Sequence, residues 1–148
     1  MGIRFKISAF KGLSAIELYS ILQLRSEVFV VEQNCVYQDI DGKDEKAIHV
    51  IGEYEGKIVA YTRIFKAGDY FENVSIGRVV VDADYRDRKW GHDLIRESIS
   101  AIQNHFGESP ITISAQLYLQ RFYESHGFVV VGETYLEDGI PHVEMLRA

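Results

Sequence analysis

A β-branched segment, a basic turn and an amphipathic helix follow one another without interruption in the middle of this chain. Residues 74–82 have the composition of a strand, the basic turn occupies residues 85–92, and apolar residues then recur at helical spacing up to Phe106. Pro110 opens another apolar segment, which is predicted to be a strand at residues 111–116. Because a helical crossover brings a strand back in the same direction, the sequence predicts that strands 74–82 and 111–116 form a parallel pair.

The other segments predict that the rest of the sheet is mostly antiparallel. Ser14 and Glu17 form a capping box that marks the start of a helix, and Glu55-Gly56 is a two-residue link typical of a β-hairpin. The expected order is strand, helix, three strands, helix, strand, helix and two strands, a mixed α/β fold with helices on both faces. The remaining predicted strands are residues 3–7, 47–54, 57–65, 128–135 and 142–146, and the last helix is residues 117–126.

Length and composition narrow the class of protein. A chain of 148 residues, of which 47% are hydrophobic, is long enough to build a core, so we expect residues 1–148 to form a single domain. The net charge of −6 argues against a nucleic-acid-binding protein, and no apolar run approaches the length of a membrane span. Cys35 is the only cysteine and no signal peptide is recognised, so we expect a cytoplasmic protein without intramolecular disulfides.

The basic turn is a candidate anion site. Arg86, Arg88 and Lys89 against Asp87 give it a formal charge of +2 in an otherwise acidic chain. A turn between a strand and a helix also directs free backbone N–H groups and the positive end of the helix toward a ligand, and phosphate binds in such places. Many crossover helices begin in the same way and bind nothing. On the turn alone, a phosphate site and a plain structural turn both stay open.

A second segment, residues 122–128, favours the phosphate site. It resembles the Phe-Tyr-x-x-x-Gly-Phe signature of the GNAT superfamily of acyl-CoA-dependent N-acetyltransferases. In that family a Gln/Arg-x-x-Gly-x-Gly/Ala turn binds pyrophosphate, and Arg86 and Gly91 stand at its first and last positions. The resemblance covers essentially the whole chain and is greatest to the ElaA-like branch. The segments similar to that branch are residues 29–34, 76–79 and 137–142.

The resemblance implies a fold and a cosubstrate. The parallel strands 76–82 and 111–116 would splay apart, and backbone groups of Val79, Val80 and Val81 would hold the pantetheine arm of acetyl-CoA in the manner of an added strand. No metal is implied. The turn would hold the pyrophosphate through Arg86, Asp87, Arg88, Lys89, Trp90, Gly91 and His92.

Lys89 departs from the family pattern, which has glycine at this place. We expect this lysine in the right-handed helical region, with its ammonium group compensating for looser amide contacts. CoA binding would then depend more on charge, and would therefore be sensitive to salt.

The resemblance also assigns catalytic roles. Tyr123 stands where the family has its general acid; because a tyrosine pKa of about 10 exceeds a thiol pKa of about 8.5, we expect it to hydrogen-bond the leaving sulfur. The alternative is that Tyr123 only packs its helix. An alkylamine, with a pKa of about 10.4, needs a base near neutral pH. Glu32 and His142 are the preferred candidates, while His49, Glu144 and an ordered water stay open.

Two roles are possible for each of the charged and reactive residues elsewhere in the chain. Arg63 and Arg78 lie within predicted apolar strands, where they either pair with carboxylates of the acidic loop at residues 39–45 or bind a substrate carboxylate. The loop itself, through Asp39, Asp41, Asp44 and Glu45, either attracts a cationic amine or is simply solvated. Cys35 is an acyl-carrier candidate, although a spectator thiol is expected because no histidine stands out as its base.

These patterns predict an N-acetyltransferase that moves an acetyl group from acetyl-CoA directly to a primary amine of a small molecule or peptide. A module that binds acyl-CoA without turnover is the alternative, and Lys89 is its motivation. An acyl-homoserine-lactone-type synthase is a third reading, because Arg25, Phe29 and Glu32 resemble the entrance region of that fold. The acceptor, and the choice between monomer and homodimer, are left open.

Overall fold

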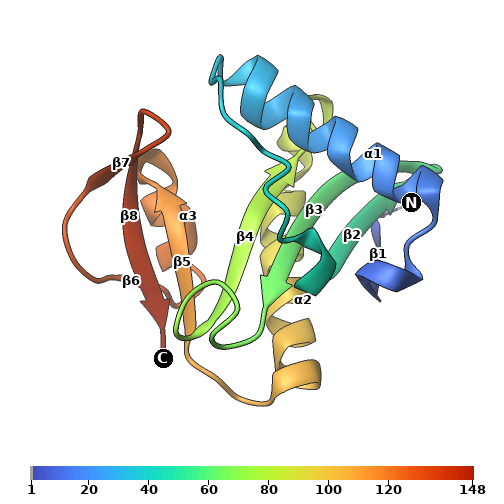
Figure 1. Ribbon diagram of the computed structural model, residues 1–148. Helices are drawn as coiled ribbons and strands as arrows, with labels where there is room; N and C mark the ends of the chain where they lie inside the picture. Colours follow the sequence, from blue (N-terminus) through green and yellow to red (C-terminus); the bar gives the residue numbers. More distant parts are fainter. Residues whose placement is uncertain (1) are drawn as a thin grey trace.

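The computed structural model describes residues 2–148, which build one eight-stranded mixed sheet flanked by helices (Figure 1). None of these helices has both the length and the apolar character that a membrane span requires. The strands are β1 (Arg4–Ala9), β2 (Ile48–Tyr54), β3 (Lys57–Phe65), β4 (Val74–Val81), β5 (Ile111–Gln116), β6 (Val129–Val130), β7 (Tyr135–Glu137) and β8 (Ile140–Arg147). The helices are α1 (Ala15–Arg25), α2 (Trp90–Phe106) and α3 (Gln120–Glu124), with the π-helix η2 (Ser26–Glu32) and the 3-10 turns η1 (Phe10–Gly12), η3 (Asp44–Lys46), η4 (Ala83–Arg88) and η5 (Leu117–Leu119).

The sheet has the strand order β1-β2-β3-β4-β5-β8-β6, and β7 also pairs with β8. Only β4 and β5 are parallel, which confirms the mixed, mostly antiparallel architecture. This pair is joined only at its beginning, where Val74 lies opposite Ile111 and Ser75 lies opposite Thr112. Beyond these residues the two strands diverge (Figure 1), and we call the opening between them the fork.

The helices α1 and α2 cover opposite faces of the sheet. Leu94 of α2 packs with Ile76 of β4 in the larger core cluster, whereas Ile21 of α1 packs with Val80 of β4 in the smaller one. Tyr123 of α3 belongs to the larger cluster and therefore lies on the α2 face. Because successive residues of a strand point to opposite faces, each strand residue near the fork can be assigned to the α1 face or the α2 face.

Three segments differ from the predicted boundaries. The end of the first helix continues to Glu32 as the π-helix η2, a distortion that is frequent at functional sites. The predicted strand at residues 128–135 is split into β6 and β7, since Gly132 with φ of +92° redirects the chain between them. The predicted helix at residues 117–126 begins as the 3-10 turn η5 and is α-helical only over Gln120–Glu124.

Candidate active site

A β-bulge in β4 opens the fork. Arg63 of β3 lies opposite Gly77, but Tyr61, two residues earlier, lies opposite Val80, so β4 contains one extra residue in this interval. Within the bulge, Arg78 has φ of +52°, a value that non-glycine residues rarely adopt. A bulge bends its strand and increases its twist, and β4 accordingly turns away from β5 after their last paired residues.

The pairing with β3 fixes which backbone groups of β4 face the fork. The N–H of Asp82 donates to the carbonyl of Val59 over 2.8 Å, so these residues form a hydrogen-bonded pair. Such pairs alternate along an antiparallel ladder, and the backbone of Val80 therefore pairs with β3, while that of Val81 points toward the fork. Of the three valines expected to hold pantetheine, Val79 lies at the bulge and lines the cavity, and Val80 has its backbone paired with β3. Val81 directs its N–H toward the fork, while its carbonyl already accepts a hydrogen bond from Nε of Arg86.

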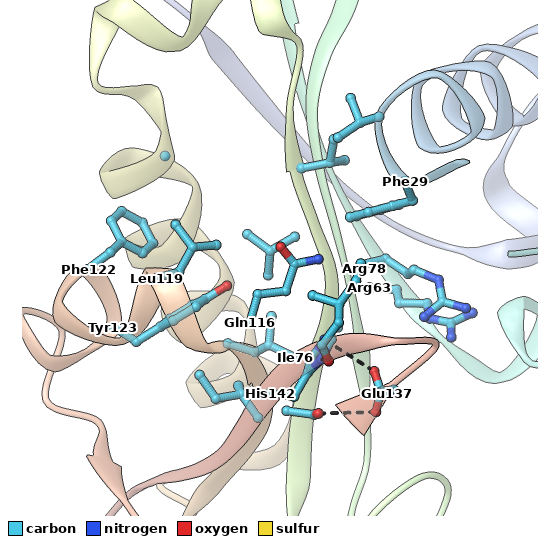
Figure 2. A pocket seen from close by; sticks show the side chains of 18 of the residues that line it. Phe29, Arg63, Ile76, Arg78, Gln116, Leu119, Phe122, Tyr123, Glu137 and His142 are labelled. Carbon is cyan, nitrogen blue, oxygen red and sulfur yellow. Dashed lines mark hydrogen bonds and ion pairs between the residues drawn. The ribbon is translucent and has the colours of Figure 1, made fainter. Parts of the chain in front are cut away.

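A cavity of about 500 Å³ extends through the fork (Figure 2). Its lining on the α2 face includes His92 and Tyr123, whereas Arg63 and His142 line it on the α1 face. The cavity thus connects the two faces of the sheet. We call its two parts the α2 half and the α1 half.

The basic turn keeps the path of a glycine-containing turn although Lys89 stands in it. Lys89 lies between η4 and Trp90, the first residue of α2, with φ of 60° and ψ of 23°. This is the left-handed region, so the expectation of a right-handed conformation was wrong. The lysine adopts the shape for which glycine is normally used, at a cost of about 1 kcal/mol.

The residues of the turn point in two directions. Trp90 does not line the cavity; its ring lies 5.0 Å from that of Tyr54 and stacks on Tyr85, with the guanidinium of Arg88 over these rings. Trp90 and Arg88 therefore anchor the turn to the end of β2, and Asp87 is also outside the lining. The four turn residues that line the α2 half are Arg86, Lys89, Gly91 and His92.

Gly91 leaves open space at the start of α2. A Cβ atom at this position would meet only the ring of Phe122 at 3.5 Å, an ordinary contact, so the fold itself does not require glycine. The first turn of a helix has N–H groups without helical acceptors and carries the positive end of the helix dipole. Gly91 lets an anion approach these groups closely, and the imidazole of His92, hydrogen-bonded to His126 over 2.9 Å, lies beside it.

Arg86 and Glu32, expected as a phosphate ligand and a base, bind each other. The Nη1 and Nη2 atoms of Arg86 donate to the Glu32 carboxylate over 2.5 and 2.9 Å, and its Nε donates to the Val81 carbonyl over 3.1 Å. Glu32 is exposed and does not line the cavity. Beside it, the side-chain amides of Gln33 and Gln116 exchange hydrogen bonds of 3.0 and 3.2 Å. These two contacts connect the end of η2 to both sides of the fork: Glu32 binds the segment after β4, and Gln33 binds the end of β5.

Tyr123 lies on α3 with its hydroxyl pointing into the cavity (Figure 2). Its ring packs edge-on against Phe122 and Phe128, and only 5% of the residue is exposed. Burial raises the pKa of the Tyr123 hydroxyl well above its usual value. A neutral, buried phenol is a hydrogen-bond donor that gives up its proton reluctantly, which suits a donor to a developing thiolate better than a full acid.

His142 lies buried on β8 in the α1 half. Its Nδ1 atom lies 2.7 Å from the carbonyl oxygen of Ile140, so Nδ1 carries a proton and Nε2 is the atom able to accept one. Nε2 lies 3.5 Å from the carboxylate of Glu137, and Figure 2 marks this contact with a dashed line. Glu137 also accepts a hydrogen bond from Ser114, which meets the hydroxyl of Tyr135. This arrangement holds the imidazole in place and would stabilise an imidazolium.

Glu137 was not identified as a site residue from the sequence. Its place in the segment 137–142, which resembles the ElaA-like branch, was the only signal. The hairpin turn between β7 and β8, with φ of +52° at Asp138 and +77° at Gly139, is what carries Glu137 next to His142.

The other reactive candidates are not aligned for catalysis. His49 is fully buried between a tyrosine hydroxyl and the carbonyl of Asp44, and burial lowers its pKa, as in a core histidine. Glu144 is exposed and lies outside the cavity lining. Cys35 does line the cavity, but its S–H donates to the carbonyl of Asp138 over 3.2 Å.

Three arginines and three aspartates form a closed ring of ion pairs, in which each carboxylate bridges two guanidinium groups. The N–O distances range from 2.6 to 3.5 Å. Burial opposes ionisation here, yet hydrogen bonds from the guanidinium groups keep the pKa values of Asp41 and Asp44 below their usual range. The acidic loop therefore pairs internally and is not a solvated segment at these positions. The members of this ionic ring are Arg25, Asp44, Arg63, Asp41, Arg78 and Asp39.

Residues 15–147 match the family model for the acetyltransferase (GNAT) domain. Protein ElaA of Escherichia coli (strain K12) is 47% identical over 137 residues, which cover 91% of this chain and 90% of that protein. A UPF0039 protein of Schizosaccharomyces pombe is 41% identical over 145 residues, covering 97% of this chain and 95% of that protein.

Solved structures agree with this match. The crystal structure of an acyl-CoA N-acyltransferase from Pseudomonas aeruginosa has a TM-score of 0.94 at 40% identity, and that of E. coli ElaA has 0.93 at 44%; each covers 99% of this chain and 100% of that one. The acyl-homoserine-lactone synthase LasI, at 13% identity and a TM-score of 0.75, shares the fold alone. With the family model and these relatives spanning nearly all of it, the chain belongs to the GNAT acetyltransferase family, in its ElaA-like branch.

Proposed function

We propose that this protein transfers an acetyl group from acetyl-CoA directly to a primary amine while both substrates are bound. The observation that carries the proposal is the cavity through the fork, which is open to Tyr123 from one face of the sheet and to His142 from the other. Two ligands that enter from opposite faces would meet there without a covalent enzyme intermediate. Acyl transfer from CoA is also the activity that membership of the GNAT family suggests.

The α2 half is suited to acetyl-CoA. The pyrophosphate would lie at the start of α2, where Gly91 leaves space and Lys89 supplies a positive charge. A carbonyl of pantetheine would accept from the N–H of Val81, which points toward the fork, in the manner of an added strand; the Val81 carbonyl becomes available only where the ligand displaces Arg86. A cosubstrate held at both places would have its thioester at the fork.

The chemistry then needs two proton transfers from the acceptor nitrogen. Nε2 of His142 takes the first proton from the ammonium form, and Glu137 stabilises the imidazolium until that proton is lost to solvent. The neutral amine nitrogen attacks the thioester carbon, and a backbone N–H of β4 stabilises the negative oxygen of the tetrahedral intermediate. The C–S bond breaks as Tyr123 hydrogen-bonds the sulfur, which departs as a thiolate, and the second proton leaves the nitrogen for solvent, so that the products are the N-acetylated amine and CoA.

Substitution of Tyr123 tests the proposal most directly. Tyr123→Phe should lower kcat by roughly 100-fold, because the hydrogen bond to the departing sulfur is lost while the packing is kept. The dissociation constant for acetyl-CoA, measured by calorimetry, should stay within about twofold. Tyr19→Phe is the matched control, since Tyr19 is exposed on α1 and does not line the cavity. An unchanged kcat in Tyr123→Phe would remove this residue from the mechanism.

Two further variants identify the base. His142→Gln should lower kcat/KM and abolish its decrease at acidic pH, because that decrease reports protonation of Nε2. Glu32→Gln should leave the pH profile unchanged and instead alter the affinity for acetyl-CoA, since it frees Arg86. If Glu32→Gln changes the pH profile and His142→Gln does not, the two roles are reversed.

The same assays separate an enzyme from a module that only binds acyl-CoA. Thiol release with any member of a broad panel of amines supports the enzyme. Binding of acetyl-CoA without thiol release across the panel would favour the module, and absence of binding would contradict both.

A further inference from the structure

Three aromatic side chains form one wall of the α1 half of the cavity. The ring centres of Phe65 and Tyr70 lie 5.2 Å apart in a stacked arrangement, and Phe71 meets Tyr70 edge-on at 5.0 Å. All three line the cavity, but Tyr70 is 39% exposed and Phe71 is partly exposed, whereas Phe65 is only 1% exposed and supports the Tyr70 ring from behind. We call these residues the aromatic wall. Rings that are accessible from a cavity offer a flat apolar surface on which another ring can pack.

The aromatic wall begins close to the fork. Phe65, the last residue of β3, lies opposite Ser75, and Ser75 is the last residue of β4 that still pairs with β5. Because Tyr70 stacks on Phe65 at 5.2 Å, a ring packed on Tyr70 lies on the α1 side of the fork, within reach of an alkyl chain from the point where the strands separate. That point is where the thioester would be attacked.

The charges of the same half select against an acidic acceptor. Among the described residues that line it, the guanidinium groups belong to Arg63 and Arg78, and the ionic ring already binds both. Lys43 approaches the Tyr70 ring at 5.0 Å but does not line the cavity. Glu137, by contrast, has a half-exposed carboxylate next to His142. A substrate ammonium finds a partner here, and a substrate carboxylate finds none.

We propose that the acceptor is an arylalkylamine: a primary amine joined by a short alkyl chain to an aromatic ring, without a carboxylate. This inference rests on the proposed acetyl transfer. The aryl group packs on the aromatic wall, and Glu137 binds the ammonium group before His142 accepts its proton. Glu137 and Tyr70 are then the residues that determine acceptor specificity.

Three probe amines test the class. With acetyl-CoA, 2-phenylethylamine should exceed L-phenylalanine in kcat/KM by roughly 100-fold, because the two differ only in the carboxylate that would face Glu137. It should exceed butylamine, which lacks the ring, by roughly 10-fold. Thiol release measures all three rates.

Two variants connect these ratios to the wall and to Glu137. Tyr70→Ala should remove most of the advantage over butylamine, so that the ratio of the two kcat/KM values falls toward one. Glu137→Gln should narrow the ratio between 2-phenylethylamine and L-phenylalanine by roughly 10-fold, whatever its effect on the absolute rate. The control is the dissociation constant for acetyl-CoA, which should be unchanged in both variants because the α2 half is intact.

The possible failures are distinguishable. If butylamine or L-phenylalanine is the better acceptor in wild type, the arylalkylamine assignment is overturned while acetyl transfer stands. If both ratios survive Tyr70→Ala and Glu137→Gln, the assignment to this wall and carboxylate is overturned. If no amine releases thiol although acetyl-CoA binds, the proposed function fails, and the acceptor assignment fails with it.

Discussion

The ionic ring and the turn before α2 each gather three basic residues, but the charges have opposite environments. In the ring, Arg25 and Arg63 are buried and each contacts two aspartates. In the turn, Arg86, Arg88 and Lys89 are all exposed, and Arg86 alone has a carboxylate partner among the ion pairs of the described residues. The ring's charges are consumed within the protein, whereas in the turn Lys89 lines the cavity without a carboxylate partner among the described residues.

This contrast shows that basic residues acquire a role from burial and pairing. Burying a charge is costly unless a partner compensates for it, so the ring holds the loop of residues 39–45 firmly on the sheet. Charges left at the surface above a helix N-terminus create a positive potential instead, and that potential favours an anionic ligand. We therefore expect changes in the ring to affect stability, and changes in the turn to affect binding of acetyl-CoA.

The largest expected effect is on stability and comes from the ring. Arg63→Met should lower the free energy of unfolding by about 3–5 kcal/mol, because it leaves the buried Asp44 and the partly buried Asp41 without one of their partners. Arg88→Met removes an exposed charge from the turn and should leave the urea midpoint close to that of wild type. Urea unfolding followed by circular dichroism measures both variants. Equal losses would contradict the distinction between the two regions.

The next effect is on binding at the turn. Gly91→Ala should weaken acetyl-CoA binding by at least about 10-fold, since the new methyl group occupies the approach to the first N–H groups of α2, at about 1.4 kcal/mol per tenfold change. Stability should not fall, because the nearest neighbour lies at contact distance and alanine favours the helix. Gly2→Ala adds the same group at an exposed position outside the cavity lining, where it meets no atom within 4 Å, and should leave the affinity for acetyl-CoA unchanged.

As the pH is lowered, the stability should respond first to His49, which lies next to Asp44, and only later to protonation of Asp41 and Asp44. Burial lowers the pKa of His49 in the folded state, so the unfolded chain binds a proton first as the pH falls below about 6.5. Stability should therefore decrease from pH 7 to pH 5, with a slope of at most about 1.4 kcal/mol per pH unit for this histidine.

Asp41 and Asp44 of the ring respond later. Their pKa values are lowered in the folded state, so their contribution should be lost only as the pH falls below about 4. Urea midpoints between pH 7 and pH 3 show the two steps. Titration by NMR separates His49 from His126, whose pKa burial also lowers. A profile that stays flat down to pH 5 would contradict the assignment to buried neutral histidine.

The smallest effect separates conformation from charge at Lys89. Lys89→Gly should raise stability by about 1 kcal/mol, or about 2–4 °C in Tm, because glycine takes the left-handed conformation without strain. Lys89→Ala should not raise it, since alanine keeps that strain. Both variants lose the ammonium group and should bind acetyl-CoA more weakly and with less dependence on salt. A stability increase in both variants would show that the strain is not the cause.

Local patterns in the sequence determined the architecture and the place of the site. The capping box at Ser14, the two-residue hairpin at Glu55-Gly56 and the parallel pair around α2 depend on residues near one another in the chain, and all three were confirmed. The basic turn and the segment 122–128 also identified the family, because all residues of each motif lie within a short stretch of the chain.

Only the tertiary structure decided which charged and polar residues meet. The ionic ring joins Arg25 of α1 to strands and a loop far along the chain, and nothing in a helical arginine signals that it is buried. Glu32 was paired with Arg86, and Glu137 with His142, by the packing of η2 and the β7–β8 hairpin. The left-handed Lys89 follows the same rule, because the surrounding turn imposes a conformation that lysine does not prefer. Periodicity and turn chemistry are local, whereas the partner of a charge depends on distances that only the folded chain sets.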